Sequence, residues 1–168
     1  MKIQIIGYSG SGKSTLAKRL GEHYKIPVLH LDNTLWYGDW QRRSSEEQTK
    51  IVKEFLDQNE SWVIDGNYKR IERRRFEECD KIIFLNYNRF TCYKQAKKRY
   101  KEWKGKIRYS CPCEEKFDFE FKKWILWDSR TKKKKKQTKE LLNTCKGEKL
   151  VFKNSKQLQK YLDSINVG

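Results

Sequence analysis

Residues 7–14 carry the clearest chemical signal in this chain. Their sequence, Gly-Tyr-Ser-Gly-Ser-Gly-Lys-Ser, matches the phosphate-binding pattern G-x-x-x-x-G-K-[ST] at every fixed position. The segment follows a mainly apolar run, residues 3–6, and precedes a stretch with helical periodicity, which is the strand–loop–helix context of the motif. Backbone N–H groups of such a loop and of the helix start form a site for a polyphosphate. The alternative is an ordinary strand–turn–helix with a chance match.

The residues of this loop, the P-loop, have distinct expected roles. Lys13 is expected to bridge the β- and γ-phosphates of ATP and to stabilise the charge that moves between oxygens. The Ser14 hydroxyl is expected to ligate Mg²⁺, and Thr15 is expected to lie near the α-phosphate. The residues that we expect to bind the nucleotide are Gly7, Ser9, Gly10, Ser11, Gly12, Lys13, Ser14 and Thr15.

Two carboxylates, Asp32 and Asp65, each stand at the end of a predicted strand. In an open α/β sheet, ligands bind beyond the carboxyl ends of the strands, which is also where the P-loop lies. Together with Ser14, these carboxylates are the candidate metal ligands, and either one could accept a proton from an attacking hydroxyl. Each could instead cap the turn that follows it. We favour the functional interpretation because both lie at the same sheet edge as the P-loop.

Several arginines are candidates for binding phosphate. A planar guanidinium binds phosphate oxygens in pairs, so Arg99, Arg108 and Arg130 on a closing lid would suit phosphoryl transfer. Residues 73–75 are three consecutive arginines on a short predicted helix, and one of them could meet a second substrate. Three adjacent side chains must, however, point in different directions.

Aromatic residues follow Asp32 in a stretch with little periodicity. Trp36, Tyr37 and Trp40 could wall a substrate site or stack a base, and core packing explains them equally well. The two histidines, His23 and His30, receive no functional role.

The elements that must position these residues alternate between strand and helix. Strands are expected at residues 2–6, 28–31, 62–65, 81–85 and 150–152. Helices are expected at 13–24, after a capping box at Ser44 and Glu47, from Arg89, and after Asn154. Residues 104–118 lack a clear period and are expected to form a loop or flap. This order predicts an α/β fold with a parallel sheet covered by helices on both faces.

Length and composition fit one domain, residues 1–168, with no long linker and no run long enough for a membrane span. The five cysteines follow no secretion signal, which predicts reduced thiols in a cytoplasmic protein. A zinc site at residues 111–113 would need further Cys or His ligands, and none is suitably spaced.

The charge is unevenly distributed. The net charge of +17 divides into +1 for residues 1–60 and +16 for residues 61–168. Such an excess attracts nucleotides, phosphorylated substrates or nucleic acid. A solvated, lysine-rich surface is the alternative. Five consecutive lysines, residues 132–136, cover every side of a helix and are expected to project into solvent.

Taken together, these motifs resemble those of the bacterial DNA topology modulation proteins, a small P-loop family related to adenylate and shikimate kinases. The matching segments span about the first three-quarters of the chain. They are residues 7–15, His30-Leu-Asp32 with Trp36 and Trp40, Trp62–Tyr68, Cys79-Asp80, Arg89, Arg99, Cys111–Glu114 and Phe117–Trp124.

The resemblance implies an ATP-binding, three-layer P-loop NTPase fold of nucleoside-kinase type. It implies five parallel strands with flanking helices and a helical lid near residues 99–130. It also implies a link to DNA supercoiling. The chain departs from relatives that have Gly-Cys-Pro, because Ser110 precedes Cys111 here.

Two functions follow as hypotheses. The first is a kinase that passes the γ-phosphoryl group of ATP·Mg²⁺ to an acceptor between Asp32, Asp65 and the lid. The second is an ATP-dependent regulator that binds DNA through the basic segment 89–139 and modulates its topology, although no DNA-binding motif is present. The kinase is preferred because both carboxylates are predicted at the nucleotide edge of the sheet.

Overall fold

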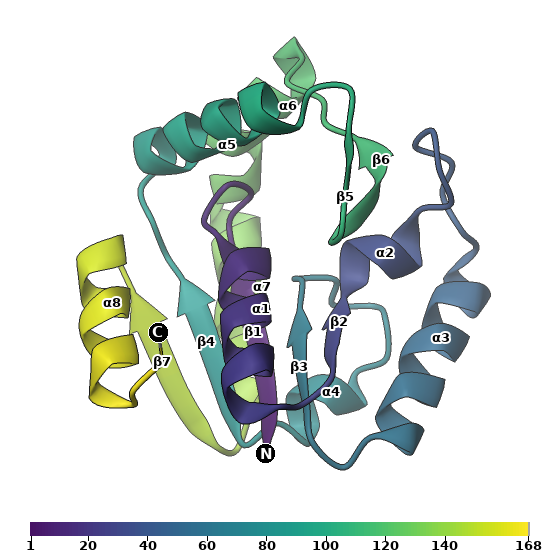
Figure 1. The fold of residues 1–168 in the computed structure, drawn as a ribbon, viewed down its shortest axis with the longest axis vertical. Helices are drawn as coiled ribbons and strands as arrows, with labels where there is room; N and C mark the ends of the chain where they lie inside the picture. Colours follow the sequence, from purple (N-terminus) through teal and green to yellow (C-terminus); the bar gives the residue numbers. More distant parts are fainter. Residues whose placement is uncertain (168) are drawn as a thin grey trace.

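The computed structural model describes residues 1–167 as a central parallel sheet flanked by helices, with a cap over one edge (Figure 1). The sheet has the strand order β2-β3-β1-β4-β7, and all of its pairings are parallel. Its strands are β1 (Lys2–Gly7), β2 (Val28–His30), β3 (Trp62–Asp65), β4 (Lys81–Leu85) and β7 (Glu148–Phe152).

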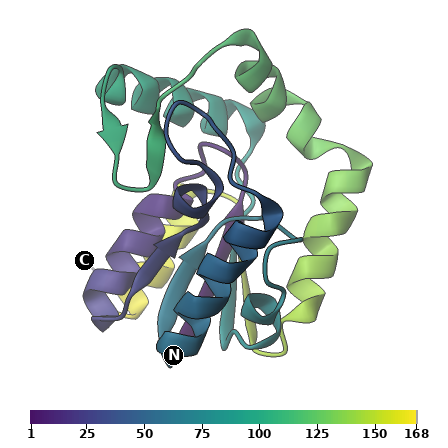
Figure 2. The same ribbon diagram turned by 90° about the vertical axis from the view of Figure 1, so that its right-hand side faces the viewer.

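Helices cover both faces of this sheet, as Figure 2 shows from the side. On one face lie α1 (Lys13–Tyr24) and α8 (Ser155–Ser164), and on the other lie α3 (Ser45–Gln58), α4 (Arg74–Glu77) and α7 (Lys132–Thr144). The short α2 (Leu31–Leu35) follows β2 directly. The predicted α/β fold with five parallel strands is therefore confirmed.

The cap segment, residues 99–130, lies over the carboxyl ends of the strands (Figure 1). It begins in the last turns of α5 (Arg89–Trp103) and continues through β5 (Ile107–Arg108), β6 (Cys111–Glu114), α6 (Phe119–Leu126) and the 3₁₀ turn η1 (Asp128–Arg130). Residues 104–118, expected to form a loop or flap, thus include an antiparallel hairpin. The hairpin escaped prediction because its strands are only two and four residues long.

Local sequence explains where the helices begin. Ser44 and Glu47 form the predicted capping box at the start of α3, and Asn154 caps α8 by accepting a hydrogen bond from the Gln157 N–H. Asn88 caps α5 in the same way, and Thr131 caps α7 at the start of the lysine run. Each cap satisfies a backbone donor that has no partner inside its helix.

The core lies between the sheet and its two helical layers. Every residue of β3 is buried, as are all but the first of β1 and β4, which is typical of parallel strands covered on both faces. Strand β7, at the sheet edge, is mostly exposed. None of the helices within residues 1–167 is both long and apolar enough to cross a membrane.

One charged side chain, Arg75, is fully buried in this core. Its guanidinium donates to Gln4 Oε1 at 2.8 Å and to the carbonyl oxygens of Gly66, Tyr68 and Ile71 at 3.2, 2.5 and 3.2 Å. These bonds fix the loop that follows Asp65. Arg75 is therefore a structural residue, and its two neighbours point outward to pair with carboxylates of Asp57, Glu77 and Glu78.

Replacing Arg75 with methionine is expected to lower the free energy of unfolding by about 3 kcal/mol, because several buried oxygen acceptors lose their donors. Urea denaturation measures this change. The matched control is Arg73→Met, whose exposed pair with Glu77 contributes less than about 1 kcal/mol. Equal effects of the two substitutions would contradict the structural role of Arg75.

Candidate active site

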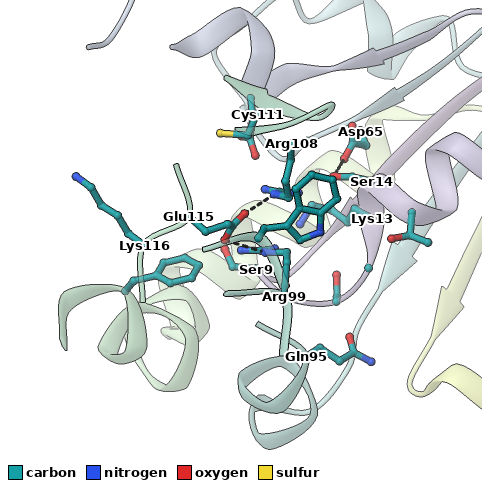
Figure 3. Close-up of a pocket in the computed structure, with 18 of the residues that line it drawn as sticks. Ser9, Lys13, Ser14, Asp65, Gln95, Arg99, Arg108, Cys111, Glu115 and Lys116 are labelled. Atoms are coloured by element: carbon teal, nitrogen blue, oxygen red, sulfur yellow. Dashed lines mark hydrogen bonds and ion pairs between the residues drawn. The ribbon is translucent and has the colours of Figure 1, made fainter. Parts of the chain in front are cut away.

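A cleft of about 1280 Å³ opens between the P-loop, the carboxyl ends of β2 and β3, and the cap segment. Its walls include residues 9–16 of the P-loop and α1, and residues 65–68 at and after the end of β3 (Figure 3). Asp32, Arg99 and Arg108 also line it. The structure thus brings most of the predicted site residues to one cavity.

The P-loop presents unpaired backbone donors to this cleft. Gly12 is the N-cap of α1 with φ +89°, and no side chain caps the helix. The N–H groups of the first turn, at Lys13, Ser14 and Thr15, therefore have no acceptor within the helix. The positive end of the helix dipole lies at the same point, so an anion here would be stabilised.

Gly10 allows α5 to pack closely against the P-loop. Its φ is +81°, and a Cβ atom at this position would lie 2.3 Å from the carbonyl oxygen of Cys92 in α5. Only glycine fits this approach. The first residue of the loop, Gly7, is held by Asn67, which accepts from the Gly7 N–H and donates to its carbonyl, both at 2.9 Å.

Lys13 is half-buried, and within residues 1–167 its ammonium group has one hydrogen bond and no ion pair. Its Nζ donates to the carbonyl oxygen of Tyr8 at 3.1 Å. Burial lowers the pKa of Lys13, while the carboxylates of Asp65 and Asp32 act in the opposite direction. A bound polyphosphate would supply negative charge that stabilises the ammonium form.

Asp65 connects the P-loop to β2 through both of its carboxylate oxygens. Ser14 Oγ donates to Asp65 Oδ2 at 2.8 Å, and His30 Nδ1 lies 2.6 Å from Asp65 Oδ1 (Figure 3 shows the Ser14 contact). Asp65 and His30 are both buried. Sequence reasoning gave His30 no role, yet its place at the end of β2, beside Asp65 in the β2–β3 register, makes it a support for this carboxylate.

The oxygens of Ser14 and Asp65 fit Mg²⁺, a cation that takes oxygen ligands and is usually held by one or two carboxylates plus substrate phosphates. Within residues 1–167 no group of three or more His, Cys, Asp or Glu side chains is arranged to hold a metal on its own. All five cysteines in the described chain are buried and unpaired.

Asp32 lies on a different element from the one predicted. Strand β2 ends at His30 and Leu31 begins α2, so Asp32 is in the first turn of a short helix rather than at a strand end. It still lines the cleft, and its Oδ1 accepts a hydrogen bond from the Tyr68 hydroxyl at 2.7 Å. Burial and the Asp32 charge both raise the pKa of Tyr68, which keeps this hydroxyl a donor.

The two cap arginines that reach the cleft share one carboxylate, which the sequence analysis missed. Glu115, whose side chain is 5% exposed, pairs with Arg99 Nε at 3.0 Å and with Arg108 Nε (Figure 3). Burial lowers the pKa of Arg99, and Glu115 acts against this shift. The two guanidiniums and the one carboxylate together carry a net charge of +1, and all three side chains line the cleft opposite the P-loop.

Arg130 is not brought to the cleft with the other arginines. Its guanidinium carbon lies 3.7 Å from the centroid of the Tyr8 ring, and its Nη2 donates to Cys92 Sγ at 3.4 Å. It therefore contacts two supports of the P-loop without lining the phosphate site.

The aromatic residues after Asp32 divide between two environments. Trp36 and Trp40 line the cleft in an edge-to-face pair with ring centroids 5.3 Å apart. Tyr37 turns away to the surface, where its hydroxyl donates to Glu47. The β5–β6 hairpin contacts α2 beside these residues: Asn33 Nδ2 donates to the carbonyl oxygen of Tyr109, in the hairpin turn, at 2.9 Å.

This fold and site define a P-loop NTPase domain. The family model described as "AAA domain" matches residues 3–121, more than half of the chain, and the chain belongs to that family. Two curated relatives match more locally. An adenylate kinase of Nocardioides sp. is 34% identical over 85 residues, which cover 49% of this chain and 41% of the relative. The uncharacterized protein YqaC of Bacillus subtilis is 36% identical over 67 residues, which cover 38% of this chain and 36% of the relative.

These matches span less than half the length of either relative. Solved structures show the same fold over the whole chain. A deoxyadenosine kinase from M. mycoides superposes with a TM-score of 0.55 at 15% identity and covers 99% of both chains. A shikimate kinase from Bacteroides thetaiotaomicron gives 0.57 at 16% identity, covering 99% of this chain and 96% of its own. The chain therefore has a kinase-like P-loop fold.

Proposed function

We propose that this protein is an ATP-dependent kinase that transfers the γ-phosphoryl group to an acceptor oxygen of a nucleotide or another small molecule. One observation carries the proposal. Two carboxylates occupy the same cleft in different settings: Asp65 is bonded to the P-loop hydroxyl of Ser14, and Asp32 is bonded to Tyr68 on the acceptor side. Both carboxylates act to raise the pKa of Lys13, against the effect of its burial.

Each group has a task in this reaction. The unpaired amides of the P-loop and Lys13 bind the phosphates of ATP and stabilise the charge of the transferred group. Ser14 and Asp65 would hold Mg²⁺, which supplies charge neutralisation on the β- and γ-phosphates when it is bound. Where the acceptor is a hydroxyl, Asp32 accepts its proton as the oxygen attacks.

The cap segment supplies the remaining positive charge. Arg99 and Arg108 face the P-loop from the cap, and closure of the cap as a lid would bring their donors to the phosphates and exclude water. We take residues 1–168 as one kinase-like domain with this lid. The adenylate, deoxyadenosine and shikimate kinases among its relatives and structural neighbours support phosphoryl transfer as the reaction class.

An acceptor screen tests the proposal. Pure protein is incubated with γ-labelled ATP·Mg²⁺ and panels of nucleosides, nucleoside monophosphates, sugars and small hydroxy acids. The expected result is label transfer to members of one panel, abolished in Lys13→Ala. Tight ATP binding with no transfer to any acceptor would count against a kinase.

A second candidate is a DNA-binding regulator, as the resemblance to DNA topology modulation proteins implies. It is favoured by one observation: all five side chains of residues 132–136 are exposed on α7. Binding of duplex DNA through them would weaken linearly with log salt, by a slope of about −0.9 per phosphate contacted. Replacing all five lysines with glutamine is expected to flatten that slope. An unchanged slope would leave the run as a solvated surface.

A further inference from the structure

A second cavity, of about 370 Å³, lies next to the P-loop and shares no lining residue with the cleft. Its walls come from Tyr8, from the end of β4 and the start of α5, from η1 and from α7. Nothing in the proposed kinase mechanism uses this space.

The charge of this cavity is one-sided. Arg89, Arg130 and Lys135 line it, and no Asp or Glu does. Within residues 1–167, the half-buried guanidinium of Arg89 has neither an ion-pair partner nor a hydrogen bond, and the side-chain amide of Asn86 beside it has none either. Cations gathered without a counter-charge repel one another, and an anion between them would relieve that repulsion.

The chemistry of the donors favours phosphate. The guanidinium of Arg89 can bind phosphate oxygens in a pair. Arg130 donates from Nε to the Ile125 carbonyl and from Nη2 to Cys92 Sγ, so its Nη1 adds a further donor, as do Lys135 and the amide of Asn86. The apolar wall is aromatic, since the rings of Tyr8 and Phe84 are tilted against each other at 5.9 Å between centroids. A small phosphorylated molecule would fit this cavity, with its phosphate near Arg89, Arg130 and Lys135 and its organic part against the rings of Tyr8 and Phe84.

We propose that this cavity binds a small phosphorylated molecule at a site separate from the substrate cleft. Arg130 connects it to the P-loop. The guanidinium of Arg130 stacks on the ring of Tyr8, whose carbonyl oxygen accepts from Lys13, and it donates to the thiol of Cys92, whose backbone supports Gly10. An occupant that draws Arg130 toward itself would alter both supports, so occupancy is expected to change nucleotide affinity. This second statement rests on the proposed nucleotide site.

Inorganic phosphate is the probe, added to protein saturated with a non-hydrolysable ATP analogue and Mg²⁺ so that the P-loop is filled. The arginine Nε–H signals are followed by ¹H–¹⁵N NMR. Saturable shifts are expected for Arg89 and Arg130 and not for Arg99. The double variant Arg89→Gln/Lys135→Gln is expected to weaken phosphate binding at least tenfold. The control, Arg73→Gln/Lys133→Gln, removes the same charge elsewhere and is expected to bind phosphate normally.

Absence of a saturable shift, or equal weakening in both double variants, would overturn the site. Affinity for the ATP analogue is then measured with and without saturating phosphate. We expect at least a threefold difference in the wild type and none in Arg89→Gln/Lys135→Gln, and an unchanged wild-type affinity would overturn the coupling. Because these readouts are binding measurements, their failure is distinguishable from a failure to find kinase activity.

Discussion

Lys13→Met is expected to lower kcat for phosphoryl transfer about 10³-fold, the upper end of what loss of one transition-state donor costs. The ammonium faces the phosphate site from α1. Methionine keeps an unbranched side chain one atom shorter than lysine and removes the charge. Steady-state kinetics with the best acceptor from the screen measure the change. Retention of more than about a tenth of the activity would show that the P-loop amides suffice without Lys13.

Lys13→Met is expected to lower activity without lowering the stability of the fold. Burial lowers the pKa of Lys13 from its ordinary value of 10.5, so the unfolded chain binds the proton more tightly than the folded one. This cost is fully present below the folded pKa and declines as pH rises toward 10.5. In the absence of nucleotide, Lys13→Met is therefore expected to be at least as stable as the wild type at neutral pH. Its advantage should shrink at alkaline pH, as thermal unfolding at several pH values would show.

That contrast separates a functional residue from a structural one. Arg75 is buried with each of its three guanidinium nitrogens donating to a fixed oxygen, and its loss is expected to unfold the protein more readily. Lys13 is held by one carbonyl oxygen, and its surroundings favour an added anion. Sequence alone places Lys13 in a motif, whereas it treats residues 73–75 as three equivalent arginines.

The strands, the P-loop and the main helices were predictable because their signals are local. Apolar runs, glycine spacing and Ser or Asn caps act over a few residues, and the structure has them where the sequence indicates. The end of β2 was wrong by one residue because Leu31 is as apolar as a strand residue and α2 is only five residues long. Short helices give too little periodicity to detect.

The supporting residues of the site were not predictable for a different reason. Glu115 gains its role from Arg99 and Arg108, and His30 gains its role from Asp65, 35 positions away. Pairings of this kind depend on how the cap and the sheet edge meet. The one available signal for His30 was its position within the predicted strand 28–31, two residues before Asp32.

Asp32→Asn is the substitution that decides whether Asp32 acts in the reaction. Asparagine has nearly the same shape and can still accept the hydrogen bond that the Tyr68 hydroxyl donates, so α2 should keep its position. It cannot take a proton. We expect kcat to fall about 10³-fold, within the range for loss of a general base, while affinity for ATP changes less than about threefold.

Two further variants make the result specific to proton transfer. Tyr68→Phe removes the hydroxyl that orients Asp32 and is expected to cost about tenfold in kcat, since the base remains but is less well placed. Asp65→Asn is expected to weaken the Mg²⁺ dependence of ATP binding, because Asp65 contacts Ser14 on the donor side. If Asp32→Asn transfers phosphate normally while Asp65→Asn does not, Asp32 only anchors Tyr68 and Asp65 is the one of the two carboxylates that the reaction needs. The two carboxylates have different hydrogen-bond partners in the same cleft. We therefore expect Asp32→Asn to bind ATP and to lose phosphoryl transfer.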